Sequence, residues 1–359
     1  MHVLLAGRIA AQPDQGGASW AVLQWVLGLR ALGHRVTVVE QLPAPSTREQ
    51  SSYARTVERQ TGVAVLLLTG ASAELVRSIG PVDLLVNLSG VLRDPALRDA
   101  APRRLYIDLD PGFTQVWHAQ GADVGLDGHT AYASVGLRLG AADCPVPLGG
   151  REWLPVPPPV VLDEWAPGAP VREAAATSVG HWRSYGPVTH DGLHYGQRAH
   201  SARRLLDLPA RSALPLRLAL GISPEETADL AALREHGWQL RDPYLVAGTP
   251  ADYRSFVRGS AAELGIAKSG YADARTGWFS DRSACYLAAG RPVVAQETGW
   301  SSVLPSGVGL HAFTDVDGAA AGLEAVLADP VRESQAAHAL AREHLDARVV
   351  LGRLLEQVA

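Results

Sequence analysis

Lysine and cysteine are the scarcest functional side chains in this sequence of 359 residues. Lysine and arginine together number 32, yet Lys268 is the only lysine, and Cys144 and Cys285 are the only cysteines. Two cysteines so far apart provide no disulfide framework, and no cluster of Cys and His has the spacing of a metal site. We therefore expect reduced thiols and a cytoplasmic location.

Long apolar runs and basic blocks are also missing. No run of 18 apolar residues occurs, so we expect no integral membrane segment. The net charge is -5, and no basic block is interleaved with aromatic residues, so nucleic acid is not an expected partner. The opening residues 1–7 have neither the charged region nor the cleavage site of a signal peptide, and they predict a first strand.

The sequence does contain the alternation of an α/β protein. An apolar run at 2–6 is followed by a loop over 8–17, a long helical pattern and a second strand at 36–40. This order predicts a βαβ unit. Further strand-like runs at 63–68, 83–88, 105–108 and 132–135 predict a parallel sheet with helices on both faces.

The composition changes near the middle of the chain, where prolines cluster between Pro145 and Pro170. Proline at this density favours an extended linker. Beyond it we predict strands at 176–179, 216–220, 244–246 and 292–295, helices at 224–236, 250–259, 280–289 and 315–328, and one or two helices over 332–357. Because 359 residues exceed the size of most single cores, we predict domains at 1–160 and 161–335, with a terminal helix at 336–359 that packs back on the first domain.

The most informative segment is 276–299, which reads as turn, helix, turn, strand and loop. Ser280 is a favourable N-cap, and Asp281 suits the first turn of a helix. The free N–H groups of such a helix start form a ready site for an anion. Lys268 lies eight residues before Thr276 and could reach the same place, where a compact ammonium would serve better than a guanidinium. The alternative is that Lys268 is an ordinary surface lysine.

This segment, with its Ala289-Gly290-Arg291-Pro292-Val293-Val294-Ala295 ending, resembles the donor-binding segment of GT-B glycosyltransferases. The resemblance extends to the opening loop with Gly16 and Gly17 and to the Gly33-His34-Arg35 turn. It implies two Rossmann-like α/β domains facing a central cleft, with the acceptor on the N-terminal side and a nucleoside diphosphate sugar on the C-terminal side. The residues that it implies for the diphosphate are Gly277, Ser280, Asp281, Arg282, Ser283 and Lys268, and those for the donor sugar are Gln296, Glu297 and Thr298.

One departure from the family pattern leaves the stereochemistry open. Large retaining families carry two glutamates eight residues apart, and the corresponding positions here hold Gly277 and Cys285. The His-Gly-Gly turn of plant-type inverting enzymes is absent as well. The sequence therefore does not choose between retention and inversion.

Two further loops are candidates for donor binding. Gly16 and Gly17 either form a tight strand-to-helix loop or allow a phosphate to approach the backbone. Gly180, Trp182 and Arg183 follow the first strand of the second domain, where Trp182 could stack on the base and Arg183 could pair with a phosphate. The alternative for Trp182 is a surface aromatic residue packed on the linker.

Three residues are candidates for the catalytic base. Asp14 lies in the opening loop, Asp110 ends a strand that faces the predicted cleft, and His129 precedes another strand. Asp110 and His129 each have an alternative interpretation as an ordinary turn residue. The sequence does not decide among the three.

The prediction is a metal-independent hexosyltransferase without a cofactor that moves a sugar from a nucleoside diphosphate sugar to a hydroxyl of a small molecule. Metal independence follows from the resemblance, since GT-B enzymes use fixed cations in place of a metal ion. A sugar-nucleotide epimerase and a catalytically silent homologue that serves as a partner protein are the alternatives. The base, the sugar, the acceptor (a natural product or a saccharide) and the oligomeric state remain open.

Overall fold

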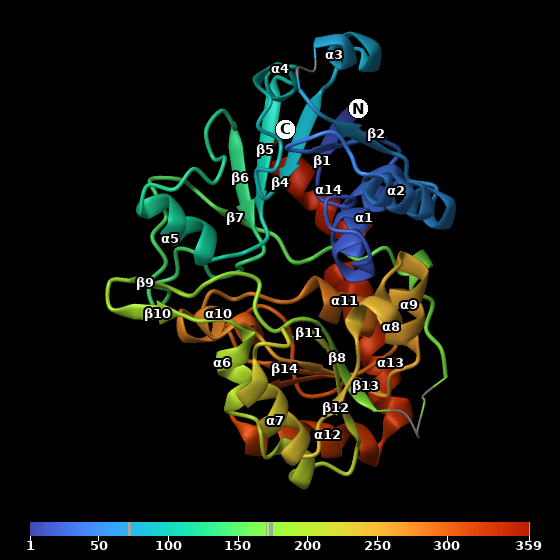
Figure 1. Cartoon of the computed structure of the whole chain (residues 1–359), viewed down its shortest axis with the longest axis vertical. Coiled ribbons are helices and arrows are strands. Elements are labelled where there is room, and N and C mark those ends of the chain that lie inside the picture. Colours follow the sequence, from blue (N-terminus) through green and yellow to red (C-terminus); the bar gives the residue numbers. More distant parts are fainter. Residues whose placement is uncertain (71–72, 170, 172–174, 359) are drawn as a thin grey trace.

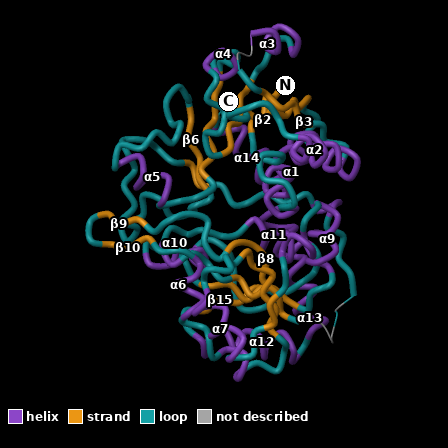
Figure 2. Tube along the Cα trace, in the orientation of Figure 1, coloured by secondary structure: helices purple, strands orange, loops and turns teal. Residues whose placement is uncertain are grey.

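The chain folds into two α/β domains, each built on one parallel sheet with helices on both faces (Figure 1, Figure 2). This is a computed structural model that describes residues 1–70, 73–169, 171 and 175–358. Pro170 of the predicted linker and Ala359 of the predicted terminal helix lie outside the described residues. Within them, no helix is both long and apolar enough to cross a bilayer.

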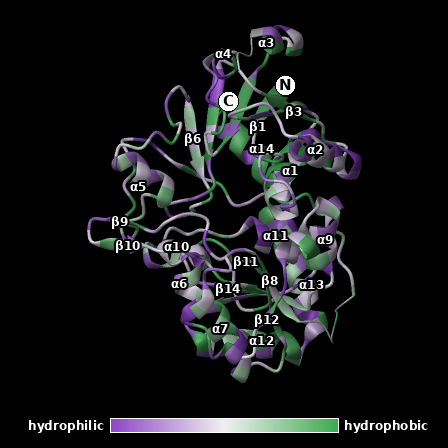
Figure 3. Cartoon of the chain, viewed as in Figure 1, coloured by the Kyte–Doolittle hydropathy of each residue, from purple (hydrophilic) through white to green (hydrophobic). Residues whose placement is uncertain are grey.

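The first domain has seven strands in the order β3-β2-β1-β4-β5-β6-β7. Its strands are β1 (His2–Ala6), β2 (Arg35–Gln41), β3 (Val65–Leu68), β4 (Leu84–Leu88), β5 (Arg103–Asp108), β6 (Ala131–Ser134) and β7 (Leu154–Pro155). Its helices are α1 (Gly16–Ala31), α2 (Arg48–Thr61), α3 (Ala73–Ile79), α4 (Pro95–Arg98) and α5 (Phe113–Ala119). The central strands β1 and β4 are buried along their whole length, as continuous apolar runs between two helical layers should be (Figure 3).

The second domain has six strands in the order β12-β11-β8-β13-β14-β15. These strands are β8 (Ala176–His181), β11 (Leu216–Gly221), β12 (Gln239–Leu240), β13 (Ala262–Gly265), β14 (Val293–Gln296) and β15 (Leu310–Phe313). Its helices are α6 (Arg198–Arg203), α7 (Thr227–Glu235), α8 (Pro243–Ala247), α9 (Pro250–Arg258), α10 (Ser269–Asp273), α11 (Asp281–Ala288), α12 (Val316–Ala328) and α13 (Pro330–Leu340). A separate antiparallel hairpin of β9 (Val188–His190) and β10 (Leu193–Tyr195) reaches toward α5 of the first domain (Figure 1).

The strand predicted at 244–246 is wrong, because these residues form helix α8. The Asp242 side chain accepts a hydrogen bond from Tyr244 N at 2.9 Å, and Pro243 occupies the first turn. An N-cap followed by proline starts a helix whatever the β-propensity of the residues that follow.

The last helix, α14 (Ala347–Gln357), crosses back to the first domain and packs on α1 (Figure 1). Val160 N donates to Leu345 O at 2.8 Å, and Ala347 N donates to Val160 O at 2.9 Å, which ties the start of α14 to the linker. Gly28 lets the two helices approach closely, because a Cβ there would lie 2.7 Å from Ala347 Cβ.

Gly28→Ala should therefore destabilise the protein, even though alanine favours a helix over glycine. We expect its free energy of unfolding to fall by about 1–2 kcal/mol, since extra volume in a packed contact costs about 1–3 kcal/mol. Gly352→Ala is the matched control, because a Cβ at this helical glycine meets no atom within 4 Å. The control should gain about 0.5–1 kcal/mol in urea unfolding. Equal shifts in the two variants would contradict this account of the α1–α14 contact.

Candidate functional site: a cleft between the two sheets

A cleft of about 440 Å³ lies between the domains, at the carboxyl ends of both sheets. The first domain contributes residues of the loop after β1, the start of α1 and the turn after β5. The second contributes residues from the end of β8, from α8 and α9, and from the start of α11. Ligands of parallel α/β sheets bind at this edge, because the loops there converge and backbone N–H groups are free.

A buried carboxylate shapes the loop after β1. Glu40, near the end of β2, is fully buried and accepts hydrogen bonds from Ile9 N at 3.0 Å, Ala10 N at 2.6 Å and Ala11 N at 2.8 Å. The loop then continues to Asp14, whose φ of 58° is in the left-handed region and whose side chain lines the cleft. Glu40 has no local sequence signal, because its partners are backbone groups brought close by the β1–β2 pairing.

Lys268 and Asp110 form an ion pair across the domain boundary. Lys268 Nζ lies 3.0 Å from each carboxylate oxygen of Asp110. The hydroxyls of Tyr185 and Tyr271 also donate to that carboxylate, and Lys268 donates to the hydroxyl of Tyr185. Asp110 comes from the first domain, whereas the lysine and both tyrosines come from the second.

Aromatic rings enclose the ammonium of Lys268. Its Nζ lies 4.2 Å from the ring centre of Tyr185, 4.9 Å from that of Phe113 and 5.2 Å from that of Tyr271, within the range of cation–π attraction. Burial lowers the pKa of Lys268, and the carboxylate of Asp110 opposes that change. All three N–H bonds of the ammonium have protein acceptors, so Lys268 does not present the free cation expected for a donor phosphate.

Removing Lys268 should lower the free energy of unfolding far more than removing the basic residue of an exposed ion pair. For Lys268→Met we expect the free energy of unfolding to fall by about 3 kcal/mol, because the Asp110 carboxylate, whose side chain is only 23% exposed, is left without a cation. Arg93→Met is the control: Arg93 pairs with Asp123 at 2.6 Å, but their side chains are 41% and 86% exposed. Its cost should stay below about 1 kcal/mol in the same urea titration. Similar costs in both variants would show that the interdomain pair is not stabilising.

The turn at 276–278 meets the first domain. Arg138 N donates to Thr276 O at 3.0 Å, and Gly136 pairs with Trp278 in an isolated bridge. Gly277 has a φ of 73°, and a Cβ there would lie 2.7 Å from Arg138 N. This glycine therefore permits a close contact between the domains, and the turn at Gly277 packs against Arg138 of the first domain.

Most polar side chains at the N-terminus of helix α11 already have partners within the protein. Ser280 is the N-cap and accepts from Arg282 N at 3.2 Å. Arg282 lines the cleft, but its guanidinium pairs with the fully buried Glu263 and donates to Val179 O at 3.1 Å. Asp281 also lines the cleft, and burial raises the pKa of its carboxyl. Ser283, by contrast, is buried in the helix packing.

The expected donor-sugar loop holds neighbouring backbone instead of lining the cleft. Gln296 Oε1 accepts from Ala267 N at 3.2 Å, and the Glu297 carboxylate accepts from Gly299 N. Thr298 Oγ1 donates to Trp278 O at 2.7 Å. These bonds fix the loop against the 276–278 turn.

Residues 180–183 divide between the cleft and the rest of the second domain. Gly180 and His181 line the cleft, and His181 Nε2 lies 3.0 Å from Gln15 Oε1 of the first domain. Trp182 is 1% exposed and donates to Asp229 at 2.7 Å, so it belongs to the core and does not offer a surface for stacking. Arg183 pairs with Glu226.

Arg198, at the start of α6, is a cation that the sequence did not single out. It donates to Ile266 O at 2.9 Å and to His181 O at 2.6 Å, and no carboxylate forms an ion pair with it among the residues described. Burial, and then the nearby Arg282, lowers the pKa of Arg198. A Cβ at Gly180 would lie 2.7 Å from Arg198 Nη1. Because Gly180 lines the cleft and has no side chain, the guanidinium of Arg198 can lie close to the cleft surface.

The remaining expectations concern Gly16, Gly17 and His129. A Cβ at Gly16 would overlap the carbonyl of Thr249, and one at Gly17 would lie 2.8 Å from the ring of Tyr253. The two glycines therefore allow α1 to approach the second domain, although Gly17 also lines the cleft. His129 precedes β6, at the amino end of that strand, and its ring lies against Tyr106, so it is not placed to act as a base in the cleft.

The structure thus brings six of the predicted site residues to the cleft: Asp14, Gly17, Asp110, Gly180, Asp281 and Arg282. The prediction missed other lining residues, among them Gln15, His181, Ser184, Tyr244 and Tyr253. His181 could have been found, because it ends the parallel strand β8, at the edge of the sheet where ligands bind. The tyrosines could not, because only the folding of α8 and α9 against α1 brings them to the cleft.

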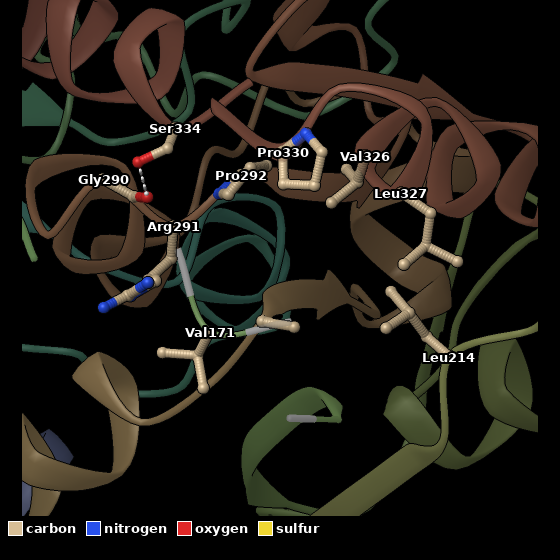
Figure 4. Close-up of a pocket in the computed structure, with 10 residues that line it drawn as sticks. Val171, Leu214, Gly290, Arg291, Pro292, Val326, Leu327, Pro330 and Ser334 are labelled. Atoms are coloured by element: carbon tan, nitrogen blue, oxygen red, sulfur yellow. Dashed lines mark hydrogen bonds between the residues drawn. The ribbon is translucent and has the colours of Figure 1, made fainter. Parts of the chain in front are cut away.

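Another pocket, of about 230 Å³, lies at the amino end of β14, away from the cleft (Figure 4). Its walls are mainly the apolar side chains of Val171, Leu214, Val326, Leu327 and Pro330. In Figure 4 the guanidinium of Arg291 points away from Val326 and Leu327, and Arg291 Nη1 donates to Ala169 O at 2.8 Å. This pocket lacks the convergent polar groups of the cleft.

No protein-family model matches the chain, and no curated protein matches it. Solved structures do match over nearly the whole length. An alpha-glucosyltransferase solved with UDP-glucose and abasic DNA superposes with a TM-score of 0.65 at 11% identity, covering 99% of this chain and 98% of that one. HepE from Anabaena, solved with UDP and glucose, gives 0.62 at 14% identity, covering 100% and 99%.

A sucrose-phosphate synthase from Thermosynechococcus elongatus gives a TM-score of 0.60 at 13% identity, covering 100% of this chain and 99% of that one. Three features define the fold class: two parallel-sheet domains, a cleft at their facing carboxyl ends, and a terminal helix that returns to the first domain. The chain has the GT-B fold, as the resemblance in the sequence implied.

Proposed function

We propose that this protein is a glycosyltransferase that takes a sugar from a nucleoside diphosphate sugar, with uridine as the base, and passes it to a hydroxyl. The observation that carries the proposal is the cleft of about 440 Å³ at the carboxyl ends of two parallel sheets. The solved structures of the same fold with UDP or UDP-glucose bound support this donor class. A hexose is the sugar we propose.

The donor diphosphate would lie against Gly180 and His181, with Arg198 behind them as the cation. Arg198 suits this role because it is half-buried and forms no ion pair with the described residues, whereas the ammonium of Lys268 and the guanidinium of Arg282 already bind carboxylates. A fixed cation near the leaving diphosphate stabilises the charge that develops on it in the transition state. We propose catalysis without a metal ion on this ground.

The acceptor would enter from the first domain. One matching structure, the alpha-glucosyltransferase, contains DNA. A net charge of -5 argues against the phosphate backbone as the acceptor here, because such binding depends on many lysine and arginine contacts. A small-molecule hydroxyl is therefore the proposed acceptor, and the free cysteines Cys144 and Cys285 suit a cytoplasmic setting.

Titration with UDP tests donor binding. At a UDP concentration of about 100 times Kd, we expect stabilisation by about 2.7 kcal/mol in a thermal-shift assay. Arg198→Met should weaken UDP binding by at least about tenfold in calorimetry, since a charge-assisted contact is lost. Arg204→Met is the matched control, because Arg204 follows the same helix but is exposed and pairs with Asp273.

Turnover of UDP-sugars then separates the functions. Release of UDP together with a glycosylated acceptor supports the transferase. Formation of an epimeric UDP-sugar would instead identify an epimerase, and UDP binding without turnover would identify a silent homologue. No binding of any nucleoside diphosphate would overturn the proposal itself.

A further inference from the structure

A small chamber of about 80 Å³ adjoins the cleft on its inner side. Ala21, Leu109 and Asp281 line both cavities, so the two meet at these residues. The remaining lining residues include three aromatic residues and two linker prolines: Trp25, Trp278, Phe279, Pro158 and Pro159. Aromatic and proline walls of this kind suit a compact ring better than a flexible polar chain.

Asp281 is the carboxylate at the junction of the two cavities. Its charged neighbour Arg282 directs its guanidinium to Glu263 and Val179 O. Within the described ranges no Lys, Arg or His forms an ion pair with Asp281. Burial raises the pKa of Asp281, which makes its ionised form a stronger base than an exposed aspartate.

The other carboxylates of the cleft are less suitable as a base. Asp110 is bonded to Lys268 and to two tyrosine hydroxyls, so its lone pairs are already engaged. Asp14 lies at the outer side of the cleft, where it also lines an open groove along α2. Asp281 alone among these three also lines the aromatic chamber.

We propose that Asp281 is the catalytic base of the transfer, and that the chamber beside it holds the ring of an aromatic or alicyclic alcohol whose hydroxyl is the acceptor. This inference rests on the proposed function and goes beyond it by naming the base and the acceptor class. The carboxylate lies between the chamber and the cleft, so a hydroxyl directed out of the chamber would meet Asp281 before it meets the donor.

The transfer step balances with these groups alone. The acceptor O–H bond breaks and its proton passes to the Asp281 carboxylate. The acceptor oxygen forms a bond to the anomeric carbon of the sugar, while the bond from that carbon to the diphosphate oxygen breaks. The electron pair of the broken bond leaves on the diphosphate, near Arg198, and Asp281 later returns its proton to solvent.

The charged and titratable groups around Asp281 come from four elements. Arg282 and Cys285 belong to its own helix, Glu263 to β13, Tyr253 to α9 and Arg198 to α6. Burial raises the pKa of both Tyr253 and Cys285. Burial raises the pKa of Asp281 as well, and the charge of the nearby Arg282 opposes that change.

The variant Asp281→Asn tests the base, because asparagine keeps the shape and the favourable position at the helix start. With a UDP-sugar donor and phenol as the acceptor probe, we expect kcat to fall by about 100-fold or more. The Kd for UDP should stay within about threefold. The wild-type rate should rise with pH through a limb above the ordinary aspartate pKa of 3.8, and the variant should lose this limb. Asp14→Asn is the comparison, since Asp14 is the other cleft carboxylate without an ion pair among the described residues.

The outcomes separate the two proposals. If UDP binds and a UDP-sugar is consumed but Asp281→Asn keeps its kcat, or if Asp14→Asn loses more, Asp281 is not the base. If the wild type glycosylates glucose or maltose in preference to phenol and cyclohexanol, the acceptor class is wrong. If no nucleoside diphosphate binds at all, the proposed function fails, and the inference about Asp281 fails with it.

Discussion

The ion pair between Lys268 and Asp110 is the interaction that holds the two domains in register. It joins the turn after β5 to the N-cap of α10, and two tyrosine hydroxyls complete its hydrogen bonds. Because the pair is largely buried, its two charges depend on each other: each without the other would be a charge in an apolar surrounding. The shape of the cleft depends on this pair, since Asp110 is one of the residues that line it.

Close backbone contacts reinforce the same arrangement on both sides of the pair. Trp20 Nε1 donates to Pro250 O at 2.9 Å and Tyr53 OH donates to Gly248 O at 3.0 Å on the α1 side. On the other side the 276–278 turn bonds to the segment around Arg138. Glycines at 16, 17 and 277 make these approaches possible, because a Cβ at each position would collide with the facing domain. Glycines in a phosphate-binding pattern and glycines at a domain contact look alike in sequence.

Much of the architecture could be predicted from local pattern. The strands at 2–6, 36–40, 83–88 and 105–108 were found because central parallel strands are continuous apolar runs. The short strands β13 and β15 were not predicted, because a run of only four residues is too short for its periodicity to distinguish a strand from part of a helix. Ser280 was correctly placed as the N-cap of α11, because capping depends on residues close in sequence.

The sequence by itself determined the fold class, the two-domain order and the start of α11, because apolar periodicity, caps and turns act within short stretches of chain. Only the tertiary structure decided which polar groups are available to a ligand. It paired Lys268 with Asp110 and Arg282 with Glu263, placed Trp182 in the core, and left Arg198 without a carboxylate among the described residues. The physical reason is that a charge is available or neutralised according to its neighbours in space, and these neighbours come from parts of the chain far apart in sequence.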